Sequence, residues 1–311
     1  MDTHDIAIIG GGPADLTAVA TLARQPHTVI VFDSNKYRND KAAGMHMVPG
    51  HEGKDLSQFR SESREAILSH YSTISFRDVP VQKIEKKSDT HFTITDPYGQ
   101  EWHFRKIILA IGSSKYSQAS KAMAPFGEIA SSDACLAVPP VPGLPVDMLV
   151  GLVIHGATNA SQLCESVILY THGDEALAAA LKASTNSQDK WMVDSRLIKR
   201  LVKSDEKSQA VIVVFEDGTK SEEKFLVSQP LTVPSGQFVQ QLGLATTPMG
   251  DIQAETPYHQ TSVRGVFAAG DCMTPYKVIP GAISSGCNAV VGASTQLQAE
   301  LHGFPSPVWG F

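Results

Sequence analysis

The chain has 311 residues, a length that predicts two domains. Hydrophobic residues make up 42% and charged residues 19%, a balance typical of globular proteins, and the net charge is −6. This charge gives no electrostatic basis for binding nucleic acid or an anionic membrane, and no apolar run approaches the roughly 20 residues that a membrane-spanning helix needs.

The strongest motif lies at the start of the chain. Apolar residues 6–9 predict a strand, three glycines follow, and residues 13–24 have a helical apolar pattern. A second β-branched run, residues 28–32, ends at Asp33. Strand, glycine turn, helix, strand and acid, in this order, are typical of a dinucleotide-binding βαβ unit. We expect Asp33 to bind a ribose, and a pyrophosphate to lie at the helix N-terminus on Gly10, Gly11, Gly12 and Pro13.

Asp15 departs from this motif. In the pattern G-x-G-x-x-G it takes the place of the third glycine, which normally keeps the helix close to the strand. Its carboxylate either caps first-turn N–H groups and leaves room for the pyrophosphate, or closes the site by its charge and bulk. Two like charges about 4 Å apart cost on the order of 1 to 4 kcal/mol. We therefore expect the dinucleotide to bind with a weakened affinity rather than not at all.

Residues 34–58 form a polar segment rich in glycine, histidine and lysine. A connection of this length in a compact domain is often functional. His46 and His51 are therefore candidate acid–base residues, and the alternative is that both are solvated loop histidines.

Short regular elements follow. The sequence predicts a helix over 58–71, a hairpin of residues 91–95 and 101–105, and a strand over 106–111 that ends at Gly112. The run AVPPVPGLPVD after them is typical of a linker, and we place a domain boundary at 140/141.

The middle of the chain is predicted to be a reduced domain. Residues 148–154 and 167–170 predict strands separated by only about a dozen residues, which hardly leaves room for a crossover helix. Asp174 is placed to cap a helix over 175–183. Further strands are predicted at residues 197–202, 210–215 and 224–227.

The last stretch combines a strand, an acid and a long helix. Residues 265–269 predict a strand that runs into Gly270 and Asp271, and a helix over 280–301 is expected to stop at Gly303. Tyr276 and Lys277, between them, are further candidate acid–base residues.

Three stretches in this order, GGGPADLTAV, KIILAIG and GVFAAGD with the helix after it, resemble the thioredoxin reductase family of flavoproteins. FDSNKYRN and the long loop after it are closer to the fungal gliotoxin-type dithiol oxidases. The resemblance spans nearly the whole chain and implies an α/β fold of two Rossmann-like, three-layer domains. An FAD domain would comprise residues 1–140 and 231–311, and a degenerate NADPH-type domain residues 141–230. The resemblance also implies further FAD-binding positions, with the ribityl chain at Asp271: Gly112, Gly270, Asp271, Ile279 and Ala282.

The redox motifs of that family are missing. None of the four cysteines are in C-x-x-C spacing, so dithiol exchange as the family performs it is excluded, and no metal site is expected. Cys135 alone stands where the pair belongs. Cys272 and Cys287 either approach each other near the flavin or are small apolar residues. The second glycine motif would fall on IHGATNA, where His155 and Ala157 replace the leading glycines, and residues 171–175 offer no arginine for a 2′-phosphate. We expect FAD, bound weakly, and no NADPH.

Three functions remain open. The first is a flavin enzyme that takes electrons from a small natural-product intermediate and passes them to O2. The second is a non-redox cyclase, isomerase or dehydratase of secondary metabolism, with FAD lost or structural, and the third is a non-catalytic binding subunit. We expect a homodimer, by the resemblance, with a small-molecule substrate and neither nucleic acid nor membrane as a partner. A reduced, cytoplasmic protein is expected, since the first strand leaves no room for a secretory signal.

Overall fold

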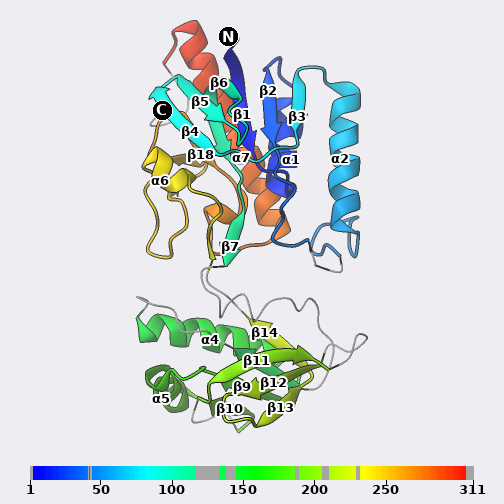
Figure 1. Cartoon of the computed structure of the whole chain (residues 1–311), viewed down its shortest axis with the longest axis vertical. Helices are drawn as coiled ribbons and strands as arrows, with labels where there is room; N and C mark the ends of the chain where they lie inside the picture. Colours follow the sequence, from blue (N-terminus) through cyan, green and yellow to red (C-terminus); the bar gives the residue numbers. More distant parts are fainter. Residues whose placement is uncertain are drawn as a thin grey trace. The chain divides into compact units, whose positions relative to one another are not determined.

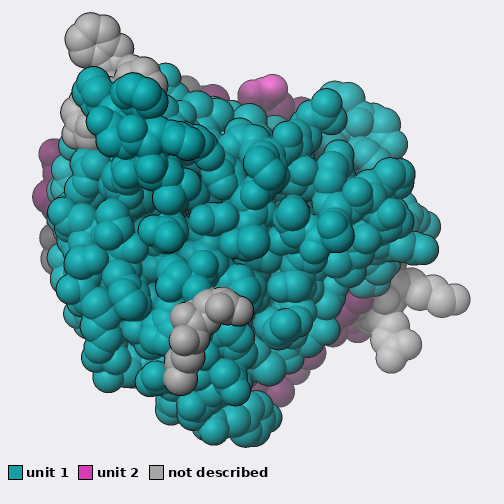
Figure 2. Space-filling model, turned by 90° about the horizontal axis from the view of Figure 1, so that it is seen from above, with its two compact units in different colours: residues 1–114, 232–311 teal, residues 115–231 magenta. Residues whose placement is uncertain are grey.

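The computed structural model describes residues 3–40, 42, 44–115, 133–137, 145–185, 189–204, 210–228 and 232–305. The chain divides into two compact α/β units, residues 1–114 with 232–311 and residues 115–231 (Figures 1 and 2). The first boundary therefore lies at 114/115 and not at 140/141. The reason is that β8 (Asp133–Ala137) pairs with strands of the second unit.

The first unit contains a mixed sheet in the order β16-β17-β18-β6-β1-β2-β3, with the hairpin β4-β5 attached to β6. Strands β18, β6, β1, β2 and β3 are parallel. The elements of this unit are β1 (Thr3–Ile9), α1 (Pro13–Leu22), β2 (Val29–Phe32), α2 (Leu56–His70), β3 (Ile74–Arg77), β4 (Lys83–Ser88), β5 (His91–Thr95), β6 (Glu101–Leu109), α6 (Phe238–Leu242), β16 (Ala254–Glu255), β17 (Gln260–Thr261), β18 (Val266–Ala268), the 3₁₀ turn η1 (Gly270–Cys272) and α7 (Ile279–His302). The predicted hairpin and long helices are confirmed.

Both faces of this sheet are buried, which explains why its central strands are continuous apolar runs. Ile6 and Ile8 of β1 point to the face that α1 and α7 cover, whereas Ala7 and Ile9 point to the face covered by the β4-β5 hairpin and α6 (Figure 1). The carboxyl ends of β1, β2, β6 and β18 therefore meet at one edge, where ligands of open α/β sheets bind.

Helices α1 and α7 pack at very short range. A Cβ built on Gly286 of α7 would lie 2.2 Å from the carbonyl oxygen of Ala14 in α1. A Cβ on Gly270 of η1 would lie 3.0 Å from the Ala14 side chain. Helix α7 ends at Gly303, which adopts the left-handed conformation expected of a C-terminal glycine. The first turn of α1, η1 and the start of α7 thus form one packed assembly.

The second unit has a four-stranded sheet in the order β10-β9-β8-β14 and a three-stranded sheet, β11-β12-β13. Its elements are β8, α4 (Val146–Ala160), β9 (Ser166–Tyr170), α5 (Glu175–Ser184), β10 (Trp191–Asp194), β11 (Ile198–Lys203), β12 (Val211–Phe215), β13 (Lys220–Glu223) and β14 (Phe225–Ser228). Two short strands, β7 (Ser113–Lys115) and β15 (Thr232–Pro234), adjoin the unit boundaries. The predicted cap of α5 is confirmed, because Asp174 accepts the N–H of Leu177.

The strand predicted over residues 148–154 is wrong, because this segment belongs to α4. Its apolar residues have helical spacing, with Leu149, Val153, Ala157 and Ala160 buried on one face. The strand before the crossover is β8, which lies parallel to β9. The β8-α4-β9 crossover therefore contains a full helix, and the predicted shortening of this connection is wrong as well. In the part of the chain that the structure describes, none of the helices combines the length and the apolar character needed to cross a membrane.

Candidate dinucleotide site

The glycine turn joins β1 to α1 at the carboxyl edge of the sheet. Gly10 has a φ of +137° and donates its N–H to the carbonyl oxygen of Phe32 at 2.9 Å. A Cβ on Gly11 would lie 1.9 Å from Oδ2 of Asp33, and one on Gly10 would lie 2.4 Å from the Ala110 carbonyl oxygen. Both positions require glycine. Gly12 is the N-cap of α1 and Pro13 its first residue, which leaves the start of the helix facing this edge.

Asp15 is buried inside this turn, with 1% of its surface exposed. Its Oδ2 accepts the N–H of Gly12 at 2.8 Å, and among the described atoms its Oδ1 has no hydrogen-bond partner. Burial raises the pKa of Asp15 well above its usual range, and the nearby Asp33 raises this pKa further. Asp15 therefore caps the start of α1, which is one of the two alternatives predicted for it. The raised pKa favours the neutral acid, and this weakens the repulsion of a pyrophosphate through which Asp15 was predicted to close the site.

Asp15 is expected to make the free energy of unfolding depend on pH. A carboxyl with a raised folded-state pKa contributes stability that is full below its unfolded pKa, about 3.9, and is lost as pH rises through the raised value. Asp15→Asn keeps an acceptor for Gly12 but cannot ionise, so its stability relative to the wild type should increase from pH 4 to pH 8. Urea unfolding at each pH measures this difference.

Asp55→Asn is the matched control for this experiment. Asp55 caps α2, and hydrogen bonds from Ser57 and from the Gln58 N–H lower its pKa. Its contribution is full above the unfolded pKa, about 3.9, and is lost only on acidification below it, so Asp55→Asn should show no pH trend between pH 4 and pH 8. Equal trends would contradict the assignment of a raised pKa to Asp15.

Asp33 stands at the end of β2, where it is 6% exposed. Its carboxylate accepts the N–H of Asn35 at 2.8 Å and the hydroxyl of Tyr37 at 2.5 Å. The guanidinium of Arg60 lies over the Tyr37 ring at 3.8 Å. Burial and the hydrogen bond to Asp33 raise the pKa of Tyr37, so it remains a neutral donor. The acid predicted to bind a ribose is therefore oriented by its own loop.

Asp271 lies in η1, directly after Gly270, which packs against Ala14 in the first turn of α1. Its Oδ2 accepts two hydrogen bonds from Arg38, from Nη2 at 2.5 Å and from Nε at 3.1 Å. The N–H of the preceding Gly270 donates to Oγ of Ser285 at 2.8 Å. Sequence reasoning did not single out Arg38, although it belongs to the stretch FDSNKYRN. Its partner is 233 residues away, so no local pattern could identify the pair.

Comparison with known proteins gives the family. The family model for pyridine nucleotide-disulphide oxidoreductases matches residues 4–286. The chain belongs to this family. It is 34% identical over 314 residues to thioredoxin reductase tcpT of Claviceps purpurea, which covers 96% of both chains. It is 35% identical over 312 residues to thioredoxin reductase aclD of Aspergillus oryzae, which covers 94% of this chain and 96% of that protein. The predicted thioredoxin reductase-like family, in its fungal branch, is confirmed.

Solved structures agree on the fold of this pyridine nucleotide-disulphide oxidoreductase. A putative thioredoxin reductase, TrxB of Bacillus anthracis, matches with a TM-score of 0.81 at 19% identity, over 96% of this chain and 99% of that chain. The thioredoxin reductase of Giardia duodenalis matches with a TM-score of 0.75 at 21% identity, over 96% and 100%. The prediction of two Rossmann-like domains is confirmed. Together with the family, these matches support an enzyme, a flavin oxidoreductase.

Membership of the pyridine nucleotide-disulphide oxidoreductases implies FAD, and the residues of the first unit fit it. The turn at Gly11 admits no side chain, Asp33 lies against this glycine, and Gly270, the residue before Asp271, lies against Ala14 in the first turn of α1. These carboxylates would hold the ribose and the ribityl hydroxyls, with the pyrophosphate on the helix N-terminus between them. The buried, unpartnered Oδ1 of Asp15 lies in the same turn.

The remaining predicted cofactor positions lie after β6 and at the start of α7. Gly112, with a φ of +66°, follows β6, and its carbonyl oxygen accepts the N–H of Ser235 at 3.3 Å. Ile279 is the first residue of α7, and Ala282 packs against the buried cluster beneath α1. The roles of Ile279 and Ala282 toward a flavin ring stay predictions.

The four candidate acid–base residues have different surroundings. His46 pairs through Nδ1 with Glu52, and the ring of His51 meets that of Phe59 edge-on at 5.6 Å. Tyr276 is 66% exposed. Lys277 donates to Asp251 at 3.0 Å and to two backbone carbonyl oxygens, those of Asp271 at 2.7 Å and Thr274 at 2.6 Å. Lys277 therefore fixes the loop after Asp271, and its ammonium is engaged at all three donors.

The thiols do not form a redox pair in the described residues. Cys272 is fully buried, donates to the carbonyl oxygens of Leu109 and Ala269, and burial raises its pKa to about 12. Cys272 and Cys287 are free cysteines. Cys135 belongs to β8 rather than to a linker, and its side chain is outside the described residues.

The predicted place of the second glycine motif is wrong. IHGATNA lies inside α4, so it is not a strand-to-helix turn. His155 and Asn159, one helical turn apart, form a side-chain hydrogen bond of 3.3 Å there. Residues 138–144, between β8 and α4, are outside the described residues. His155 and Ala157 therefore give no evidence against NADPH binding.

Proposed function

We propose that this chain is an FAD-dependent oxidase that acts on a small natural-product intermediate and uses O2 as the acceptor. One observation carries the proposal: Asp33 and Asp271 are retained around the glycine turn, while none of the cysteines are in C-x-x-C spacing. The chain keeps the means to bind a flavin and lacks the dithiol through which its relatives' family transfers electrons. Its substrate would therefore be oxidised directly.

FAD, when bound, supplies two-electron chemistry: the substrate loses two electrons and two protons, and O2 gains them as H2O2. The chain's own residues bind and orient. Asp33 and Asp271 accept hydroxyl hydrogen bonds, and Lys277 holds the backbone carbonyl of Asp271 in place. His46, oriented by Glu52, and the exposed Tyr276 are the groups proposed to exchange protons with the substrate. We also propose a homodimer, no use of NADPH, and neither nucleic acid nor membrane as a partner.

We expect the purified chain to have a flavin absorption band, partial in intensity and increased by added FAD. After anaerobic reduction with dithionite, admission of O2 should restore the oxidised spectrum and release one H2O2 per flavin. NADPH should not reduce the flavin. These spectra, with a peroxidase assay for H2O2, test the proposal. Reduction by NADPH, or reoxidation without H2O2, would contradict it.

A non-redox enzyme is the second candidate, and a specific observation favours it. The groups that a dinucleotide would use already have hydrogen-bond partners within the chain. The Gly12 N–H donates to Asp15, while Asp33 accepts from the Tyr37 hydroxyl and Asp271 accepts from Arg38. If the wild type binds no FAD when FAD is in excess, while Asp15→Gly binds FAD, the site has been closed by substitution. The cyclase, isomerase or dehydratase proposal then replaces the oxidase.

A further inference from the structure

The glycine turn of this chain is short of donors for a pyrophosphate. The Gly12 N–H is engaged by Asp15 at 2.8 Å, and Pro13 has no N–H. Two of the positions where a helix start normally meets an anion therefore cannot donate. The buried Oδ1 of Asp15, which lacks a partner among the described atoms, faces Gly10 in the same turn. This unpartnered atom independently indicates that the turn is completed by a ligand.

Arg38 stands beside this turn. Its partner Asp271 follows Gly270, whose Cβ, if built, would lie 3.0 Å from the side chain of Ala14 in the first turn of α1. Both hydrogen bonds of Arg38 go to Oδ2 of Asp271, from Nε and Nη2. A guanidinium has five N–H donors, so these two bonds leave donors for a phosphate. Oδ1 of Asp271 is not used by them and can accept a ribityl hydroxyl.

The segment around Arg38 is anchored at its neighbour. Tyr37 donates its hydroxyl to Asp33 at 2.5 Å, and Arg60, which pairs with Asp40 at 3.1 Å, covers the Tyr37 ring. Arg38 is thus held by its own ion pair and by the fixed residue before it. A guanidinium held in place in this way binds an anion with little further loss of conformational entropy.

We propose that Arg38 is a phosphate-binding, specificity-determining residue of the dinucleotide site and that it replaces the donor withdrawn by Asp15. This rests on the proposed function for the identity of the dinucleotide as FAD. The positive charge of Arg38 offsets the pyrophosphate charge, while its contact with Asp271 couples the phosphate end of the site to the ribityl end.

The test titrates the full-length chain with two phosphate-bearing probes, ADP and FAD, and two phosphate-free probes, adenosine and riboflavin. Arg38→Gln should weaken ADP and FAD roughly 10- to 100-fold, as expected for a lost charge-assisted hydrogen bond, and should change adenosine and riboflavin less than about twofold. Arg38→Lys, which keeps the charge without the fork, should give a smaller loss. Arg105→Gln is the matched control, because Arg105 is exposed to a similar extent (39% against 36%) and lies in the middle of β6, away from the carboxyl end of this strand.

The outcomes separate this inference from the proposed function. Equal weakening of all four probes by Arg38→Gln would mean that Arg38 only holds the fold of the site, and overturns the inference. Unchanged ADP binding, or no ADP binding by the wild type, overturns it too. If ADP binding depends on Arg38 but FAD does not bind, the inference stands and the oxidase proposal fails.

Discussion

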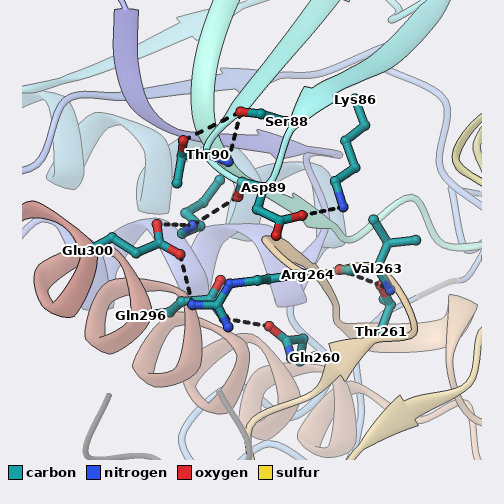
Figure 3. A network of polar contacts seen from close by, with 11 residues as sticks. Lys86, Ser88, Asp89, Thr90, Gln260, Thr261, Val263, Arg264, Gln296 and Glu300 are labelled. Atoms are coloured by element: carbon teal, nitrogen blue, oxygen red, sulfur yellow. Dashed lines mark hydrogen bonds and ion pairs between the residues drawn. The ribbon is translucent and has the colours of Figure 1, made fainter. Parts of the chain in front are cut away.

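Replacing Glu300 with alanine is expected to destabilise the chain by about 3 kcal/mol, whereas replacing Lys106 with methionine should leave its stability unchanged or increased. Lys106 of β6 is fully buried and donates to Oε2 of Glu300 at 2.5 Å. Arg264 donates to the other oxygen of Glu300 at 3.1 Å, and Figure 3 shows these two side chains next to each other. Removing Glu300 leaves a buried ammonium without its counter-ion, while removing Lys106 leaves Glu300 with Arg264.

Urea unfolding of the two single variants and of the double variant measures this asymmetry. The double variant Lys106→Met with Glu300→Ala should recover most of the stability that Glu300→Ala loses, since no buried charge remains. Burial lowers the pKa of Lys106, against the opposing effect of Glu300. The stability that deprotonation of Lys106 contributes is full above the ordinary lysine pKa of the unfolded chain. It is lost as pH falls through the lowered pKa of Lys106 in the folded chain. The advantage of Lys106→Met should therefore shrink toward high pH. A loss of 3 kcal/mol in Lys106→Met would contradict this account.

Gly286→Ala is expected to cost about 2 to 3 kcal/mol and to weaken flavin binding. The added Cβ would lie 2.2 Å from the backbone carbonyl oxygen of Ala14, which a side-chain rotation cannot relieve. Helices α1 and α7 would have to move apart. That shift displaces the first turn of α1 from η1, and so separates the pyrophosphate position from Asp271. Thermal unfolding and FAD titration measure the two effects.

Gly281→Ala provides the matched control on the same helix. The Cβ of this variant would meet its nearest neighbour, Cγ2 of Val278, at 3.4 Å, an ordinary contact. Replacing a glycine with alanine in a helix should then be neutral or stabilising by up to about 1 kcal/mol. If both variants lose the same stability, the close approach of α7 to Ala14 does not determine the effect.

The sequence by itself determined the local elements of the site. The glycine turn before α1, the acid at the end of β2 and the stop of α7 at Gly303 each depend on a few consecutive residues, so pattern and propensity suffice to predict them. The hairpin of β5 and β6 was predicted for the same reason. The prediction failed where one local pattern is compatible with both a strand and a helix. Residues 148–154 are apolar and β-branched enough for a strand. Only burial of one face against the second unit's sheet makes them part of α4.

Only the tertiary structure decided what surrounds each site residue. Asp15 became a buried cap with a raised pKa because the folded chain excludes water from it, and desolvation depends on all the neighbours rather than on the motif. Lys277 was a candidate base by type, but the folded loop supplies three oxygens to its ammonium. Arg38 and Asp271 meet across 233 residues because β2 and β18 are parallel strands that end at the same edge of one mixed sheet. Such long-range pairs follow from strand order, which no local pattern in the sequence encodes.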